Sequence, residues 1–352
     1  MNNQLILITG VSGFIATHIV DSFIRAGYLV RGTVRSPSTA EKVSQTFPEY
    51  VQDGRLTFAI VQDITSSHTF DEAVTGVTGV IHTAAPFQFQ TEDNERDLLK
   101  PSIEGTKNLL NSIQMYAPGV QRVVLTSSFA SIIDLYKGNR AGYLYKETDW
   151  NPVTYEEAAF PGTSPVVAYC ASKTLAEREA WNFVERECPS WDLTTICAPL
   201  VYGPNKNLTA NLAHLNTSSA DLYRLMSPTS KSSDPVPTNV FWVWADVRDV
   251  ANAHLRAFEL PEAGGQRFLV SEGRYSYQMM ADVLRERILD IKERVPLGLP
   301  GSGLGGAQVY GIDNSKSKQV LGMSYRTFEE SVVDAGRAFL ALEAQEAALT
   351  RI

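Results

Sequence analysis

Tyr169 and Lys173 are the residues whose types and spacing point most directly to chemistry. They stand four positions apart, so on a helix they lie on the same face. An ammonium group beside a phenol favours the ionised phenol, whose ordinary pKa is about 10. A phenol tuned in this way can exchange a proton near neutral pH, as the reduction of a carbonyl requires. Such pairs also occur on ordinary helix surfaces, so the meaning of this pair depends on the rest of the chain.

A glycine-rich turn near the start of the chain indicates a dinucleotide site. Residues 5–9 form an apolar run typical of a strand buried on both faces, and residues 17–26 form an amphipathic segment. Gly10 and Gly13 lie between them in the spacing G-x-x-G-x-x-A, which differs from the general G-x-G-x-x-G. Glycines at such a turn let the backbone approach a pyrophosphate at the N-terminus of the following helix. The alternative is an ordinary strand–helix turn that is rich in glycine.

Arg35 ends the next predicted strand and indicates which dinucleotide binds. Proteins specific for NAD usually carry Asp or Glu at this place, where the acid hydrogen-bonds the ribose 2′-hydroxyl. Here Lys42 follows Arg35, and no acidic residue lies within residues 31–40. Arginine binds phosphate through charge-assisted hydrogen bonds that are often bidentate. The sequence therefore predicts NADP(H), and the alternative is an arginine that is merely exposed to solvent.

Asp63 follows a third apolar segment, residues 56–61, and has two interpretations. Its position suits contact with the adenine edge of a bound dinucleotide. It equally suits the N-cap of a following helix, because aspartate accepts hydrogen bonds from the free amides of a first helical turn.

Length, charge and cysteine content restrict the class of protein. The chain has 352 residues, of which 44% are hydrophobic, and its net charge is −8. An acidic chain with no long basic run is not expected to bind nucleic acid or an anionic membrane. It shows neither an apolar stretch of membrane length nor a signal-peptide pattern. Cys170, Cys188 and Cys197 have no metal-binding spacing, and their odd number suits a reducing compartment, so we expect a cytoplasmic protein.

Strand and helix patterns alternate through about residue 197. The strand candidates are residues 5–9, 29–34, 56–61, 79–83, 121–126 and 192–197. Helical patterns lie between them, and the longest cover residues 94–116 and 168–187. This alternation predicts an α/β fold with a doubly wound parallel sheet of the Rossmann type, covered by helices on both faces.

The pattern changes after Pro204. Residues 205–240 are polar, as expected for helix and loop over a cleft, and residues 241–250 predict a strand that returns to the sheet. A turn-rich loop is expected at 295–306 and a final helix at 327–348. These features predict a smaller C-terminal substrate domain interleaved with the first domain. It comprises about 205–240, 263–305 and 315–352, and the dinucleotide-binding domain comprises 1–204 with about 241–262 and 306–314.

Motifs along most of the chain resemble those of the extended short-chain dehydrogenase/reductases. They are T-G-V-S-G-F-I-A at 9–16, G-T-V-R-S at 32–36, I-H-T-A-A-P-F at 81–87, E-R-D-L-L at 95–99, R-V-V-L-T-S-S at 122–128, Y-C-A-S-K at 169–173, V-Y-G-P at 201–204 and D-V-R-D-V-A-N-A-H at 246–254. The chain resembles in particular the branch of fungal NADPH-dependent carbonyl (methylglyoxal/ketone) reductases, which is related to plant dihydroflavonol reductases. It departs from the family at Cys197-Ala198, where members often carry Asn-Pro beside the nicotinamide.

The resemblance implies three catalytic residues. Tyr169 would donate a proton to the carbonyl oxygen as hydride reaches the carbon. Lys173 would lower the pKa of that phenol and hold the nicotinamide ribose. Ser128 would hydrogen-bond the substrate oxygen and stabilise its developing charge, with Ser127 as the neighbouring alternative. The implied cofactor is NADP(H), the implied substrate is a small-molecule ketone or aldehyde, and the implied assembly is a monomer or a homodimer.

The resemblance also implies the lining of the site. The residues expected around the cofactor are Gly10, Ser12, Gly13, Phe14, Ile15, Arg35, Lys42, Asp63, Ile64, Thr83, Ala84, Ala85, Thr126, Tyr169, Lys173, Pro199 and Val201. The apolar and aromatic residues next to the catalytic segments are expected to form the substrate pocket, and each has plain core packing as its alternative. They are Phe87, Phe129, Ile133, Leu200 and Tyr202.

Other conspicuous residues are expected to serve the structure. His82 lies in a predicted buried strand and His254 in a helical pattern, and neither has a metal partner in the sequence. Trp242 and Trp244 suit a buried strand. The run D-V-R-D at 246–249 is expected to fix a strand–helix junction by hydrogen bonds.

Three functions remain in competition. The first is an NADPH-dependent carbonyl reductase. The second is a nucleotide-sugar epimerase or dehydratase, which would share the Ser, Tyr and Lys but keeps NAD bound, so Arg35 and Lys42 oppose it. The third is a dinucleotide-binding regulator without catalysis, which the complete set of Ser128, Tyr169 and Lys173 opposes. We therefore expect the reductase.

Overall fold

A seven-stranded parallel sheet forms the centre of the protein. The computed structural model describes residues 4–85, 91–207, 212 and 215–349. The strands run in the order β10-β7-β5-β4-β1-β2-β3, and each neighbouring pair is parallel. They are β1 (Leu5–Ile8), β2 (Leu29–Val34), β3 (Leu56–Ile60), β4 (Gly79–His82), β5 (Arg122–Ser128), β7 (Asp192–Ala198) and β10 (Arg267–Leu269). The predicted Rossmann-type α/β fold is confirmed.

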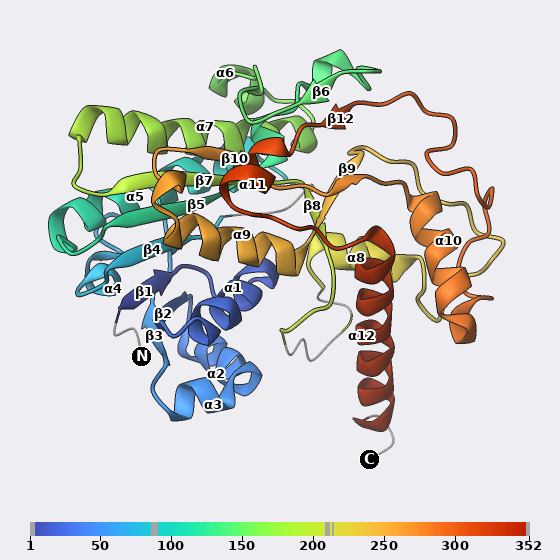
Figure 1. Ribbon diagram of the computed structural model, residues 1–352, viewed down its shortest axis with the longest axis horizontal. Helices are drawn as coiled ribbons and strands as arrows, with labels where there is room; N and C mark the ends of the chain where they lie inside the picture. The colour runs from blue at the N-terminus through green and yellow to red at the C-terminus, as the bar shows by residue number, and fades with distance from the viewer. Residues whose placement is uncertain (1–3, 86–90, 208–211, 213–214, 350–352) are drawn as a thin grey trace.

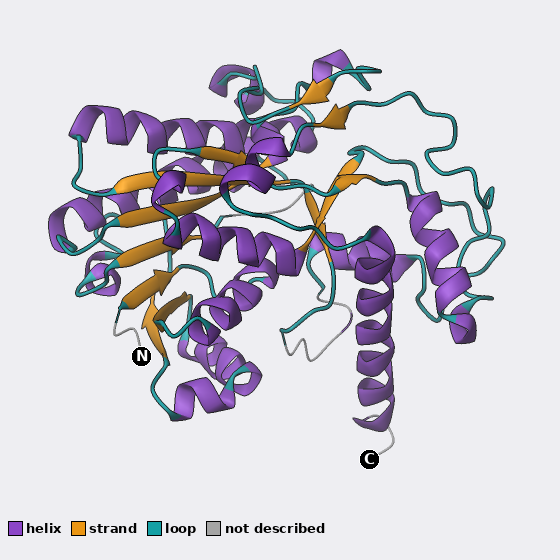
Figure 2. Ribbon diagram, in the orientation of Figure 1, coloured by secondary structure: helices purple, strands orange, loops and turns teal. Residues whose placement is uncertain are grey.

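Helices cover both faces of this sheet (Figures 1 and 2). On one face, α1 (Phe14–Arg25) packs beside α9 (Val247–Glu259) over one apolar core. On the other, α5 (Lys100–Tyr116) packs beside α7 (Pro165–Glu187), with the short α4 (Asp71–Val74), over a second core. The helices α2 (Pro37–Thr46) and α3 (Pro48–Gln52) close the edge near β2 and β3. Because helices bury both faces, the strands read as continuous apolar runs in the sequence.

The strand order reverses between β1 and β4. From β1 the chain proceeds to β2 and β3 on one side, and then crosses to β4 and β5 on the other. Loops that leave the carboxyl ends of β1 and β4 therefore diverge to opposite faces and open a crevice between them. This topology places a ligand site at the carboxyl edge of the sheet.

A smaller unit lies beside that edge. Its sheet has the order β11-β9-β8 and consists of β8 (Leu200–Tyr202), β9 (Val243–Asp246) and β11 (Gly273–Arg274). Around it stand α8 (Thr217–Arg224), α10 (Tyr277–Arg287) and α12 (Phe328–Leu349), which share an apolar core (Figure 1). The short strands β6 (Leu144–Tyr145) and β12 (Gly311–Ile312) pair near α6 (Tyr155–Ala159), and α11 (Ser315–Val320) packs beside β10.

The expectation for residues 241–250 is wrong. Only Val243–Asp246 is a strand, and it joins the smaller sheet next to β8, not the main sheet. The chain then enters α9 because the Asp246 carboxylate caps the helix and accepts from the Arg248 amide at 2.7 Å. The seventh strand of the main sheet is β10, which sequence reasoning missed because three residues give no periodic signal.

The two histidines that were expected to serve the structure form hydrogen-bonding contacts with neighbouring threonines. His82 Nδ1 lies 2.8 Å from the Thr9 hydroxyl, and His254 Nε2 lies 2.7 Å from the Thr126 hydroxyl. Burial lowers the pKa of His82 to about 3 and that of His254 to about 4, so both rings are neutral at ordinary pH. Within the described ranges, no helix is both long enough and apolar enough to span a membrane.

Gly79 sets how closely α9 lies against the sheet. A Cβ at this position would lie 2.2 Å from Cε2 of Phe258 on α9. We therefore expect Gly79→Ala to lower the free energy of unfolding by about 1–3 kcal/mol through overpacking, measured by urea denaturation. Gly273→Ala is the control, because its Cβ would meet open space. Equal stability of the two variants would contradict this account of the packing.

Candidate active site

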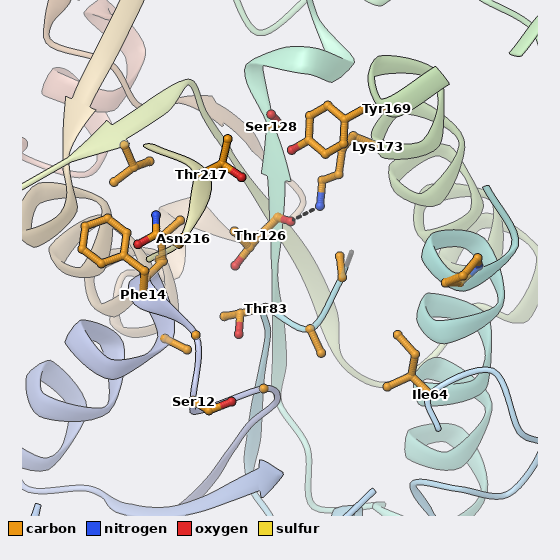
Figure 3. Close-up of a pocket in the computed structure, with 18 of the residues that line it drawn as sticks. Ser12, Phe14, Ile64, Thr83, Thr126, Ser128, Tyr169, Lys173, Asn216 and Thr217 are labelled. Atoms are coloured by element: carbon orange, nitrogen blue, oxygen red, sulfur yellow. Dashed lines mark hydrogen bonds between the residues drawn. The ribbon is translucent and has the colours of Figure 1, made fainter. Parts of the chain in front are cut away.

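A large cavity opens at the carboxyl edge of the main sheet. It has a volume of about 1030 Å³ and reaches from the glycine turn after β1 to the end of β5 and the middle of α7. Figure 3 shows Ser12 at one end and Ser128 with Tyr169 at the other. The described residues predicted to bind a cofactor line this cavity, with Lys42 as the exception. The cavity therefore joins the dinucleotide motif to the Tyr–Lys pair.

The glycine turn builds one end of the cavity. Gly10 adopts a φ of 68°, and a Cβ there would lie 3.2 Å from Cα of Ala84, so a side chain would crowd the backbone that follows β4. The Gly13 amide donates to the Gly10 carbonyl at 2.9 Å, and α1 begins directly afterwards at Phe14. The N-terminus of α1 thus faces the cavity, an arrangement that suits a pyrophosphate.

Arg35 lies on the cavity wall at the end of β2, together with Thr39. Its neighbour Ser36 caps α2 by accepting from the Thr39 amide at 3.2 Å. Lys42 is exposed on α2 and is not part of the wall. Arg35 is therefore the cation that the structure presents to the cavity from this element.

Asp63 stands on the cavity wall and stabilises a turn, so the helix N-cap interpretation is wrong, because the next helix begins only at Asp71. Its carboxylate accepts from the amide of Thr65 at 2.8 Å and from the Thr65 hydroxyl at 2.7 Å. These hydrogen bonds, with a contribution from Arg35, lower the pKa of Asp63 below its usual value. Ile64, the next residue, also lines the cavity (Figure 3). The turn therefore contributes one polar side chain, Asp63, and one apolar side chain, Ile64, to the cavity wall.

Ser128, Tyr169 and Lys173 meet at the other end of the cavity (Figure 3). Tyr169 and Lys173 lie one turn apart on α7 and are only 8% and 9% exposed. The Ser128 and Tyr169 side chains are hydrogen-bonded, and Lys173 Nζ donates to the Thr126 carbonyl at 3.0 Å. The long helix α7 and the strand β5 therefore hold all three groups in fixed positions.

Burial dominates the protonation of this cluster. It raises the pKa of Tyr169 well above 10, and the hydrogen bond from Ser128 offsets part of that rise. The lowering that the sequence predicted from Lys173 is not found, because the ammonium group is turned to the Thr126 carbonyl. Burial also lowers the pKa of Lys173 to about 8, against the opposing effect of Glu177. At neutral pH the phenol thus carries its proton and the lysine is charged.

The residues expected to form a substrate pocket are divided by the structure. Phe129 and Leu200 line the cavity, although Phe129 also packs edge to face on Tyr145 in the core. Ile133 is buried in the core behind the wall, and Tyr202 is buried with its hydroxyl bonded to that of Tyr275 at 3.0 Å. Phe87 lies outside the described residues. Ile133 and Tyr202 therefore belong to the core, as the alternative interpretation proposed, and do not line this cavity.

Sequence reasoning missed a polar part of the wall. Asn216, at the N-terminus of α8, and the next residue Thr217 lie across the cavity from Lys173 (Figure 3). Further lining residues that were not predicted are Arg96, Asp97, Pro101, Leu215, Ser218 and Phe241. An N-cap signal at Asn216 was readable in the sequence. The sequence predicted helix and loop over a cleft for residues 205–240, but it did not indicate which residues of that segment line the cavity.

Solved structures share this architecture over nearly the whole chain. The structure of the yeast methylglyoxal/isovaleraldehyde reductase Gre2, complexed with NADPH, matches with a TM-score of 0.89 at 37% identity, covering 97% of this chain and 99% of that one. The Gre2 of Candida albicans, in complex with NADPH, matches with a TM-score of 0.89 at 32% identity, covering 96% and 99% of the two chains.

Curated relatives match over a similar extent. The NADPH-dependent methylglyoxal reductase GRE2 of Saccharomyces cerevisiae is 38% identical over 350 residues, which cover 96% of this chain and 98% of that protein. The ketoreductase azaE of Aspergillus niger is 39% identical, over 95% of this chain and 97% of its own. The cinnamoyl-CoA reductase CAD2 of Medicago truncatula is 33% identical, over 94% and 93%.

The matching family model covers residues 6–271, which include the glycine turn, the Tyr–Lys pair and the strand β10. This chain belongs to the NAD dependent epimerase/dehydratase family, within the extended short-chain dehydrogenase/reductases.

Proposed function

We propose that this protein reduces ketones or aldehydes to alcohols with NADPH. The observation that carries the proposal is one cavity with a cation, Arg35, at one end and a protonated, buried phenol, Tyr169, at the other. A cation at that place suits a phosphate. The fit to a dinucleotide rests on the narrow glycine turn at Gly10 and on the N-terminus of α1. The yeast and Aspergillus relatives described above, a methylglyoxal reductase and a ketoreductase, support the same reaction class.

In the proposed reaction, bound NADPH supplies hydride to the carbonyl carbon. Tyr169 donates its phenolic proton to the carbonyl oxygen, and its raised pKa keeps that proton available before the reaction. Ser128, already hydrogen-bonded to Tyr169, donates a hydrogen bond to the same oxygen as negative charge develops on it. Lys173, which lines the cavity one turn from the phenol, contributes a positive charge there and would hold the nicotinamide ribose.

The chemistry of the cavity favours the reductase over the other two functions. An epimerase that retains NAD would be expected to carry an acid at the end of β2, and this chain carries Arg35 on the cavity wall. A regulator without catalysis would have no need for the complete set of Ser128, Tyr169 and Lys173, which the cavity brings together.

The proposal includes the setting in which the reaction occurs. Cofactor binding belongs to residues 1–204 with about 241–262 and 306–314, and substrate binding to about 205–240, 263–305 and 315–352. The partner is a small-molecule carbonyl compound, and the protein acts in the cytoplasm as a monomer or a homodimer. The net charge of −8 agrees with the absence of nucleic acid from this proposal.

Tyr169→Phe tests the proton donor. We expect turnover to fall by about 10²-fold or more, because the carbonyl oxygen loses its acid, whereas NADPH binding changes little. The rate is followed as NADPH oxidation with aryl ketones, β-keto esters and dicarbonyls, and binding is followed by fluorescence. Tyr116→Phe, at an exposed position on α5, is the control. Wild-type protein that oxidises NADPH with none of these compounds would overturn the proposed function.

Arg35→Ala tests the choice of cofactor. Loss of a hydrogen-bonded charge costs about 1.5–3 kcal/mol, so the KM for NADPH should rise about 10-fold or more, while kcat with saturating NADPH stays near wild type. Lys42→Ala is the comparison, because Lys42 is exposed outside the cavity wall and should change the KM less. Wild-type turnover with NADH that equals turnover with NADPH would refute the role of Arg35.

A further inference from the structure

Glu177 is a buried carboxylate one helical turn beyond Lys173 on α7. Its side chain is 0% exposed and pairs with Arg267 on β10, which is 8% exposed. Arg267 Nε donates to Glu177 Oε1 at 2.7 Å, and Nη2 donates to Oε2 at 3.1 Å. Isolated charges are very costly to bury, so a pair of this kind requires partners for every remaining donor and acceptor.

Glu177 finds those partners on the elements that form the catalytic end of the cavity. Oε2 accepts from the Ser127 hydroxyl at 2.5 Å and lies 2.7 Å from the hydroxyl of Ser131 in the turn η2 (Phe129–Ser131). Oε1 accepts from the Thr195 hydroxyl on β7 at 2.7 Å. One carboxylate thereby connects α7 to β5, η2, β7 and β10.

These bonds enclose Ser128 on both sides along the chain. Ser127 precedes it, and the Ser131 hydroxyl lies 2.7 Å from the Ser128 carbonyl oxygen. Arg267 Nη2 also donates to the Ser131 hydroxyl at 2.8 Å. The backbone that carries Ser128 therefore cannot move without breaking a hydrogen bond of the Glu177–Arg267 pair.

Glu177 also affects the protonation of Lys173. The ionisable groups that face Lys173 are Tyr169 and Glu177 on α7, His82 on β4 and Cys197 on β7, with Arg267 behind Glu177. Burial keeps His82 neutral and raises the pKa of Cys197 to about 12, so its thiol is neutral as well.

Glu177 itself is ionised. Burial alone would raise its pKa, but Arg267 and the two serine hydroxyls outweigh burial and bring the pKa below its usual value. Among the described groups that face Lys173, Glu177 thus supplies the negative charge. This charge opposes the tendency of burial to strip the proton from Lys173.

We propose that Glu177, held ionised by Arg267, is a positioning residue for the reaction, which fixes the strand end that carries Ser128 and keeps Lys173 in its ammonium form. This inference rests on the proposed function for its kinetic consequences. Its electrostatic part concerns Lys173 alone and is measurable without turnover.

Glu177→Gln removes the charge with little change of shape. We expect kcat to fall about 10-fold or more, because hydrogen bonds to a charged group are lost at the strand end, while the KM for NADPH stays near wild type. In wild type, Lys173 loses its proton as the pH rises through about 8. Without the Glu177 charge the pKa of Lys173 falls, so the alkaline decline of kcat should begin at lower pH, shifted by about one unit. Tyr169 loses its own proton at higher pH and does not set this limb.

Asp192→Asn is the matched control. Asp192 on β7 pairs with Arg122 on β5 through contacts of 2.5 and 2.8 Å, so it joins the same two strands at the opposite end of the sheet. We expect this variant to lower thermal stability and to leave the pH profile of kcat unchanged. A shift of the alkaline limb as large as that of Glu177→Gln would show that any loss of rigidity has this effect, and would overturn the proposal.

Two further measurements keep the inference independent of folding and of the reaction class. Glu177→Asp retains the charge and shortens the side chain, so it should keep the wild-type alkaline limb while kcat falls. NMR titration of ¹³C-labelled lysine, with Lys173→Met for assignment, should show a lower pKa of Lys173 in Glu177→Gln than in wild type, whether or not the protein reduces carbonyls. An unchanged Lys173 titration would overturn the electrostatic part, and an unchanged kcat would overturn the positioning part.

Discussion

The attachment of the end of β5 to α7 is the constraint on which the rest of the site depends. Three consecutive residues of the strand each bind this helix: the Thr126 carbonyl accepts from Lys173, the Ser127 hydroxyl donates to Glu177, and the Ser128 hydroxyl meets Tyr169. Parallel pairing of β5 with β4 and β7 fixes the strand end in turn. The positions of Ser128, Tyr169 and Lys173 are therefore set by sheet register and helix packing.

The burial of this attachment affects the protonation states of its ionisable groups. The cluster is largely buried, and burial and the neighbouring groups together set the protonation state of each ionisable group. Tyr169 keeps its proton, His82 and Cys197 stay neutral, and Glu177 is ionised through Arg267. The Cys197 thiol lies 3.8 and 3.9 Å from the Glu177 carboxylate, within the network that supports the strand. Its neighbour Ala198 lines the cavity. The pair Cys197-Ala198, where the sequence departs from the expected family pattern, therefore touches both the network and the cavity.

The two ends of the cavity are formed by different kinds of structural element. One end combines the glycine turn and the N-terminus of α1 with side chains at the ends of β2 and β3, and these strands follow one another in the main sheet. The other end combines side chains of separate elements, since α8 packs in the core of the smaller unit, whereas Phe241 packs in a core with Phe129 and Tyr169. Relatives can therefore share the dinucleotide site while their substrate walls differ, because loops and added elements change without disturbing the sheet.

Local patterns of the sequence indicated the parallel α/β fold, the glycine turn, the cation after β2 and the Tyr–Lys spacing. The choice of Ser128 as the third member of the set was implied by the resemblance to the family. The strand at 241–250 was misassigned, since an apolar run does not state which sheet it joins, and β10 was too short to be seen. Tertiary structure alone decided that Ile133 and Tyr202 lie in the core, that Thr217 faces the site and that Arg267 meets Glu177. Arg267 and Glu177 stand 90 positions apart in the sequence. The other outcomes depend on which side of a wall a residue faces, and local periodicity carries neither kind of information.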